Sequence, residues 1–166
     1  MQRDIVLLVL FGVFAISTSS AWGQARRAVL AEDTGAFMSI APDQVNMRAA
    51  PRAGSLIQWV YVRAGLPVLV IETYDNWRKV VDPAGTRGWM RADMLSKQRT
   101  AMVMGGTHAL FAAPRPDARQ THLIAAGNVG LLSGCITSWC KMRFDGAEGW
   151  ILRSHIWGVF PTEEFP

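Results

Sequence analysis

Histidine and cysteine are among the residue types that most often act as nucleophiles, acids, bases or metal ligands, and few of them are present in this sequence. His108, His122 and His155 stand singly, without a partner four residues away or the spacing of a zinc-binding set. We interpret them as loop or surface residues and expect no metal site and no cofactor. The sequence therefore favours a protein that is not an enzyme, with an unrecognised active site as the remaining alternative.

Cys135 and Cys140 are the two cysteines, and four residues separate them. This is not the two-residue spacing of a redox motif, and the segment between them supplies no third metal ligand. If the segment is the tip of a hairpin, the two residues face each other at a distance that suits a disulfide. We predict a structural disulfide worth about 2 kcal/mol, because its ring is small. Free thiols in a cleft with a histidine would instead indicate an enzyme.

Tryptophan is the unusual excess, with seven residues in the chain. Trp89 and Trp150 each follow a glycine at the start of a strand, and we assign both to the core. Trp77 and Trp139 each end a loop and start a strand. The latter pair either lines a groove, as aromatic residues do in peptide-binding barrels, or is half-buried in a hairpin.

Trp59 and Tyr61 alternate with valines in "SLIQWVYVRAG". One face of such a strand must point outward. If that face carries Trp59 and Tyr61, the protein exposes an aromatic patch, which folded domains rarely do without a reason. The corresponding stretch later in the chain, "QTHLIAAG", lacks this pair.

The elements that carry these residues occur twice. Three stretches align with others about 62 residues later: residues 37–51 with 100–114, 64–77 with 126–139, and 88–95 with 149–156. Each copy is about 60 residues long and shows strand-like alternation bounded by Gly, Pro, Asn and Asp. The sequence therefore predicts a tandem duplication of one small all-β unit.

A hairpin is the clearest element of each copy. In the first copy it comprises Trp77–Val81, a turn at "DPAGTRG", and Arg87–Arg91, followed by a single helical turn at Arg91–Leu95. Short strands separated by turn signals indicate a small barrel or sandwich. Because units of this size bury little core, we expect packing of copy against copy and the disulfide to stabilise them. Glu163 and Glu164 are expected on a frayed tail.

The first residues have the layout of a secretory signal peptide, with Arg3, an apolar run over residues 5–16 and small residues at the cleavage region. We predict a signal peptide at 1–23, cleaved after residue 23 or 25, and a flexible segment at 24–35. The run is shorter than the ~20 residues of a membrane span, so membrane contact would require an uncleaved signal segment. We expect a periplasmic or secreted protein, where cysteine pairs form disulfides.

The stretch "VNMRAAPRAGS" followed by "AGLPVLVIETYDNWRKVVDPAGTRGWMRADML" resembles the bacterial SH3-like domain, and "CITSWCKMRFDGAEGWILRSHIWGV" resembles its version with a Cys on each side of the Trp. The resemblance implies two tandem SH3-like barrels at 36–97 and 98–158, with a C-terminal tail at 159–166. The second copy departs from the pattern, because Ala109 and Phe111 replace Asn46 and Arg48.

The resemblance further implies binding rather than catalysis, with a cell-wall peptide, peptidoglycan or an envelope protein as the partner. The expected contact surface places aromatic residues over the ligand and an arginine on its carboxylate: Trp59, Tyr61, Tyr74, Trp77, Arg48 and Arg78. The net charge of +4 names no partner, and export together with scattered basic residues argues against nucleic acid. The alternative function is a scaffold in which the two barrels pack together and support an envelope assembly.

Overall fold

The computed structural model describes residues 35–165, which all belong to one compact unit of the chain. The predicted signal peptide, its cleavage site and the segment up to residue 34 lie outside the described residues. In the part that the structure describes, no helix has the length and apolar character needed to cross a membrane.

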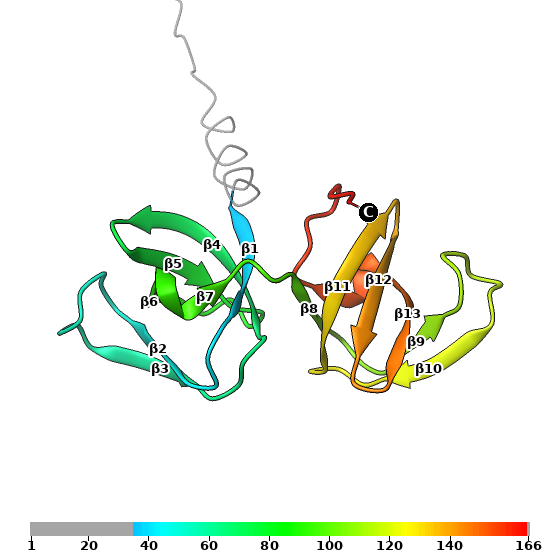
Figure 1. The fold of residues 1–166 in the computed structure, drawn as a ribbon, viewed down its shortest axis with the longest axis horizontal. Helices are drawn as coiled ribbons and strands as arrows, with labels where there is room; N and C mark the ends of the chain where they lie inside the picture. The colour runs from blue at the N-terminus through cyan, green and yellow to red at the C-terminus, as the bar shows by residue number, and fades with distance from the viewer. Residues whose placement is uncertain (1–34, 166) are drawn as a thin grey trace, which may run out of the picture. The chain divides into compact units, whose positions relative to one another are not determined.

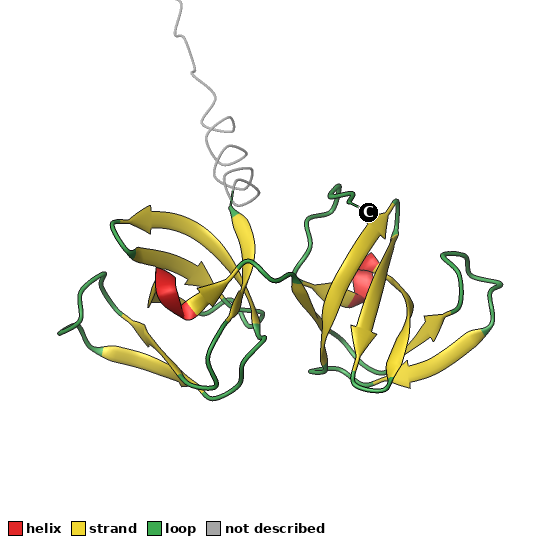
Figure 2. Ribbon diagram, in the orientation of Figure 1, coloured by secondary structure: helices red, strands yellow, loops and turns green. Residues whose placement is uncertain are grey.

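The described residues form two antiparallel sheets of seven strands each (Figures 1 and 2). The first sheet contains β1 (Ala36–Ile40), β2 (Val45–Arg48), β3 (Ile57–Tyr61), β4 (Pro67–Tyr74), β5 (Trp77–Val81), β6 (Arg87–Arg91) and β7 (Leu95–Ser96). The second contains β8 (Thr100–Val103), β9 (His108–Phe111), β10 (Gln120–Ile124), β11 (Val129–Ile136), β12 (Trp139–Phe144), β13 (Ala147–Leu152) and β14 (Ile156–Trp157).

The two sheets have the same topology, in the orders β3-β2-β6-β5-β4-β1-β7 and β10-β9-β13-β12-β11-β8-β14. A short 3-10 helix precedes the last strand in each: η2 (Ala92–Met94) and η3 (Arg153–His155). The all-β fold and the tandem duplication are thus confirmed. The predicted hairpin matches β5 and β6 residue for residue, and η2 falls within the predicted helical turn.

The glycine before Trp89, and the glycine before Trp150 at the equivalent position, allow two strands to approach closely. A Cβ on Gly88 would lie 2.6 Å from Met47 Cγ on β2, and a Cβ on Gly149 would lie 2.9 Å from the Phe111 carbonyl oxygen on β9. Both contacts are shorter than side chains tolerate. The Gly-Trp pair therefore recurs because the same strand crossing recurs in each barrel.

Each barrel has its own core. The largest fully buried side chains of the first barrel include Met47, Val80 and Met90. Those of the second include Leu110 and Met142. The two cysteines of the disulfide belong to the core of the second barrel.

The predicted disulfide is present between Cys135 and Cys140, whose Cα atoms lie 4.1 Å apart. The two residues are direct partners in the β11–β12 hairpin, and both are fully buried. Thr73 and Arg78 pair at the corresponding position of the β4–β5 hairpin, so the first barrel lacks this crosslink.

The tail after β14 is ordered against the second barrel, so the expectation of a frayed tail was wrong. Phe165 forms a bridge with Cys135 through two backbone hydrogen bonds. Glu164 accepts a hydrogen bond from the Thr137 amide, and Glu163 forms an ion pair with Arg99. These partners are far from the tail in sequence, which explains why no local signal revealed them.

Candidate ligand-binding surfaces

Strand β3 is the edge of the first sheet and carries an exposed apolar surface. It pairs with β2 alone among the described strands. The side chain of Trp59 is 58% exposed and that of Val60 46% exposed. These two neighbours point to opposite faces, so both faces of the strand are open to solvent. Leu56, Ile57 and Val62 extend the same exposed apolar run.

Tyr61 lies on the same face of β3 as Trp59 but is half-buried. Its hydroxyl donates a hydrogen bond to Asp82 (2.9 Å) and lies 3.8 Å from the Met47 sulfur. Burial, and then the hydrogen bond to Asp82, raises the pKa of Tyr61 above its ordinary value. Tyr61 therefore fixes the end of β3 to the barrel, while Trp59 remains open to a ligand.

A second group of the predicted residues lies on the outer face of β4, β5 and β6. Tyr74 pairs with Trp77 at the tip of the β4–β5 hairpin, so their side chains share a face. Tyr74 is 60% exposed and packs edge-on against Trp89, with ring centroids 6.5 Å apart. Trp77 is only 7% exposed. On this face Tyr74 is thus the accessible aromatic residue, whereas the Trp77 ring is largely covered.

The prediction for the core tryptophans is confirmed for Trp89, which is buried, but not for Trp150, which is half-buried. Trp77 and Trp139, placed by the sequence in a groove or a half-buried hairpin position, are both buried. The burial of each tryptophan ring depends on strands and loops that are distant in sequence. A local sequence pattern carries no information about these strands and loops.

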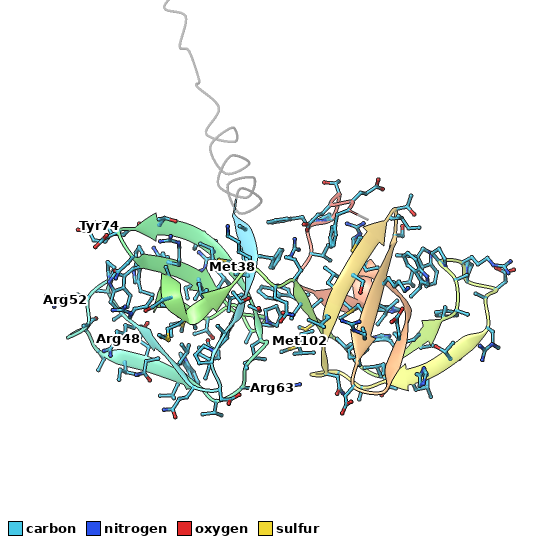
Figure 3. The ribbon with its side chains drawn as sticks, in the orientation of Figure 1. Met38, Arg48, Arg52, Arg63, Tyr74 and Met102 are labelled. Carbon is cyan, nitrogen blue, oxygen red and sulfur yellow. A yellow bond between two sulfur atoms is a disulfide. The ribbon has the colours of Figure 1, made fainter. Side chains whose placement is uncertain are left out.

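Arg48 and Trp77 line a cavity of about 160 Å³ together with Asn46, Arg91 and Met94. The cavity has room for one small side chain or carboxylate rather than a whole ligand. Figure 3 shows Arg48, Arg52 and Tyr74 at one end of the first barrel. The structure therefore brings Arg48, Trp77 and Tyr74 to one region, whereas Trp59 and Tyr61 lie on β3.

Both predicted carboxylate-binding arginines hold backbone carbonyls. Arg48 Nη1 donates to the Ser55 carbonyl (2.7 Å) in the loop between β2 and β3. Arg78 Nη1 donates to the carbonyls of Asp75 and Trp77 at the β4–β5 turn. Asp75 has a φ of 50°, so Arg78 stabilises a turn in the left-handed region.

The corresponding region of the second barrel has a different chemistry. Phe111 packs edge-on against Trp139 with ring centroids 5.3 Å apart. His108 and His155 stack with centroids 3.7 Å apart, and a nitrogen of His108 lies 2.8 Å from the Met104 carbonyl oxygen. Partial burial, and then the nearby His108, lowers the pKa of His155. Two histidines thus come together that the sequence shows as isolated residues.

The second barrel also contains a cavity of about 580 Å³ that the sequence did not reveal. Its lining combines hydroxyl, apolar and guanidinium groups: Thr137, Ser138, Leu152, Arg153, Ser154, Ile156, Val159 and Pro161. The Arg153 guanidinium is buried and donates to the carbonyls of Phe160, Glu163 and Thr137. Arg153 therefore holds the tail in place over this cavity.

Residues 35–165 contain no group of three or more His, Cys, Asp or Glu side chains arranged to hold a metal ion. Charge is unevenly distributed between the barrels. Residues 36–99 carry nine Lys and Arg against five Asp and Glu, whereas residues 100–165 carry five of each. The basic excess of the protein thus belongs to the first barrel, the same barrel that exposes β3.

A bacterial SH3 domain matches the chain twice, at residues 41–97 and 105–158. The protein belongs to the bacterial SH3 domain family. Each matched range covers one barrel from its second strand onward, so the resemblance seen in the sequence is confirmed.

Among solved structures, the chain is similar to NlpC2 and NlpC1 from Trichomonas vaginalis and to an NlpC/P60 family protein from Bacillus cereus. Sequence identities are 11%, 11% and 12%, and TM-scores are 0.35, 0.34 and 0.34. The alignments cover 75%, 74% and 73% of this chain but 48%, 45% and 55% of the others. The chain thus spans about half the length of these structures. No curated protein is significantly similar to it in sequence.

The β2–β3 and β9–β10 hairpins both lie within the matched ranges, whereas the tail from residue 159 lies beyond them. The exposed edge β3 is therefore a variation on an element of the bacterial SH3 domain. The 580 Å³ cavity, by contrast, depends in part on Val159 and Pro161 of the tail.

Proposed function

We propose that this bacterial SH3 protein is exported to the periplasm or secreted and acts as a non-catalytic module that binds a peptide at the cell envelope. The peptide belongs to an envelope protein or to peptidoglycan. In this proposal the barrels comprise residues 36–97 and 98–158, and the first barrel carries the binding surface. Membership of the bacterial SH3 domain family supports the proposal, because small β-barrels bind peptides over exposed aromatic residues.

The distribution of exposed apolar side chains carries the proposal. Six of the eight large hydrophobic side chains that are most exposed in the described residues lie on the first barrel: Leu56, Ile57, Trp59, Val60, Val62 and Tyr74. The second barrel contributes Leu123 and Ile136. Their concentration on the first barrel makes that barrel the candidate surface for a partner, because large exposed apolar patches mark interaction sites.

Arg48 and Arg78 add positive charge beside these aromatic residues. Each guanidinium has five N–H donors, more than the one or two carbonyls that it binds within the described residues. A ligand carboxylate can therefore use the remaining donors. The 160 Å³ cavity beside Arg48 and Trp77 is the place where such a group would fit.

Co-sedimentation with purified peptidoglycan sacculi and affinity capture from envelope extract test the proposal. The variants are Trp59→Ser and Tyr74→Ser, both at exposed positions where the fold tolerates a small polar residue. The matched control is Leu123→Ser, which removes an exposed apolar residue from the corresponding edge strand of the second barrel. We expect the first two variants to lower capture by one or both materials about fivefold and the control to retain it.

Absence of capture by either material would overturn the proposal, as would an equal loss in the Leu123→Ser control. Trp77→Ala is a poorer test, because Trp77 is buried and its removal disturbs the fold itself.

A scaffold is the second candidate function, favoured by one cluster of aromatic contacts. Phe37 on β1 packs against Trp157 on β14 and against Phe160, with ring centroids 5.1 and 4.8 Å apart. Arg99 lies over the Phe37 ring and binds Glu163. If the scaffold function holds, Phe37→Ser lowers the thermal stability of the protein and abolishes capture of partners together. If the binding function holds, Phe37→Ser leaves capture unchanged.

A further inference from the structure

We propose that β3 binds its partner by strand addition, taking up an extended protein segment whose apolar core is flanked by acidic residues. This inference rests on the proposed function and specifies its site and its partner. In strand addition, main-chain hydrogen bonds along the free edge supply affinity, and alternate side chains supply specificity. The exposed edge of the first sheet has the properties that this mode of binding requires.

The outer side of β3 is a free edge. Because β3 ends the sheet order and pairs only with β2 among the described strands, one row of its N–H and C=O groups faces away from the sheet. Natural edge strands are usually protected by lysines, prolines or a covering loop. Between Arg52 and Arg63 the sequence "AGSLIQWVYV" contains no charged residue and no proline. β3 thus lacks the usual protection against pairing.

The second barrel has a free edge of its own at β10, but with a different composition. Val60 and Leu123 hold the same register position, opposite Asn46 on β2 and Ala109 on β9 respectively. Around Leu123, however, β10 reads "QTHLI", so polar residues stand where β3 has Ile57 and Trp59. The two edge strands therefore differ at the positions of Ile57 and Trp59, where only β3 carries apolar side chains.

The positive charges at the two ends of β3 indicate the chemistry of its partner. Arg52 and Arg63 flank β3, both are exposed, and Figure 3 shows them at opposite ends of the β2–β3 hairpin. Arg63 Nη1 also donates a hydrogen bond to the Gly127 carbonyl (3.2 Å). This contact is exposed to solvent, so the charge of Arg63 remains accessible. A segment with a carboxylate near each end would therefore match the charges of this edge.

A second β3 strand, from another copy of the chain, would not complement the charges of this edge. Two β3 strands paired antiparallel about a two-fold axis place the Arg52 end of one copy beside the Arg63 end of the other. The pairing would also bring together two barrels that each carry an excess of basic residues. Like charges opposed across an interface disfavour association. The charges thus favour a separate acidic segment over self-association.

A synthetic peptide tests the inference directly. The probe is an acetylated and amidated L-peptide of about nine residues, with Glu at each end and alternating Thr and Val between, long enough to span β3 in extended form. We expect binding by isothermal titration calorimetry that weakens with salt, and weaker binding by the same peptide with Gln in place of both Glu residues.

N-methylation separates strand addition from binding through side chains alone. Every second N–H of an added strand faces β3, and the others face solvent. Methylating one set of alternate residues should abolish binding, and methylating the other set should leave it nearly unchanged. Equal effects of the two sets would overturn strand addition, as would a failure of the unmodified probe to bind.

The protein variants form a matched pair. Val60→Lys places a charge on the β3 edge and should weaken probe binding about tenfold. Leu123→Lys makes the same change at the corresponding position of β10 and should leave binding unchanged. Equal loss in both variants would contradict the assignment to β3. Dimerisation of the wild type in sedimentation, abolished by Val60→Lys, would show a second copy to be the occupant instead.

The outcomes also separate this inference from the proposed function. If wild type and Val60→Lys bind sacculi or envelope partners equally well, the proposed function stands and strand addition fails. If the wild type captures neither material and ignores the probe, both fail.

Discussion

Phe111 in the second barrel stands at the register position that Arg48 holds in the first. Arg48 lies opposite Trp89, and Phe111 lies opposite Trp150. Arg48 uses its Nη1 to hold the carbonyl of Ser55, whereas Phe111 packs against another aromatic ring. One position in a duplicated fold thus carries a polar anchor in one copy and an apolar contact in the other.

Arg48→Leu should destabilise the first barrel by about 1–2 kcal/mol, because the carbonyl of the buried Ser55 loses a charge-assisted hydrogen bond. Urea unfolding followed by tryptophan fluorescence measures the change. Arg52→Leu is the control, since Arg52 is exposed in the same loop and should shift the unfolding free energy by less than about 0.5 kcal/mol. Similar losses in both variants would show that Arg48 acts only through net charge.

Reduction of the Cys135–Cys140 disulfide should destabilise the second barrel by about 2 kcal/mol, because the closed ring is small. The double variant Cys135→Ala, Cys140→Ala should show at least this loss, since both residues are fully buried. Thermal unfolding with and without reductant measures it. A loss located in the first barrel, which has Thr73 and Arg78 at these positions, would contradict the assignment.

Glu163→Gln should destabilise the docked tail by about 2 kcal/mol at neutral pH. Partial burial alone would raise the pKa of Glu163, but hydrogen bonds from Arg99 and from the Phe160 amide outweigh it and lower the pKa. A lowered folded-state pKa gives stability that is present above the ordinary Glu pKa and is lost as the pH falls through the folded-state value.

Unfolding experiments at neutral and at strongly acidic pH check this prediction, because the wild type should lose its advantage over Glu163→Gln in acid. Glu148→Gln is the control: Glu148 pairs with Lys141 at an exposed site, where ion pairs contribute little. An advantage of Glu163 that persists in strong acid would show that the ion pair with Arg99 does not stabilise the tail.

Much of the fold could be predicted from the sequence. The turns and the strand alternation around Trp77 and Trp139 depend on residues that are close in sequence. Both hairpins could therefore be predicted from the sequence, and the structure contains them. The disulfide followed from the same logic, because residues that flank a tight hairpin must face each other. Hairpins and a disulfide across a hairpin depend on residues that are close in sequence, so a sequence pattern can reveal them.

The stacked pair of His108 and His155 gives a further prediction. The pKa of His155 is lowered by burial and by His108, so the unfolded chain binds a proton more readily than the folded one. Stability should therefore fall as the pH drops from about 7 through the ordinary His pKa to the lower folded-state value.

His155→Met introduces the residue that the first barrel has at this position, Met94, and should flatten the pH dependence of stability below about pH 7. Chemical unfolding across this range measures it. His122→Gln, at an exposed position, is the control and should leave the dependence unchanged. An unchanged dependence in His155→Met would exclude the stacked pair as its source.

The candidate site was only partly predictable. The sequence identified Trp59, and the structure leaves it exposed, because a single edge strand offers no partner to cover it. The sequence also identified Trp77, but strands that arrive from elsewhere in the chain bury that ring. Whether an aromatic residue is available to a ligand is thus decided by contacts that are distant in sequence.

By itself, the sequence determined that this protein is a doubled all-β chain with a disulfide in its second hairpin, since turn residues, alternation and repetition act over short distances. Only the tertiary structure decided which tryptophans are buried, that β3 is an open edge, and that the tail docks through Glu163 on Arg99. The physical reason is that burial and ion pairing depend on residues brought together across tens of positions, which a local pattern cannot encode.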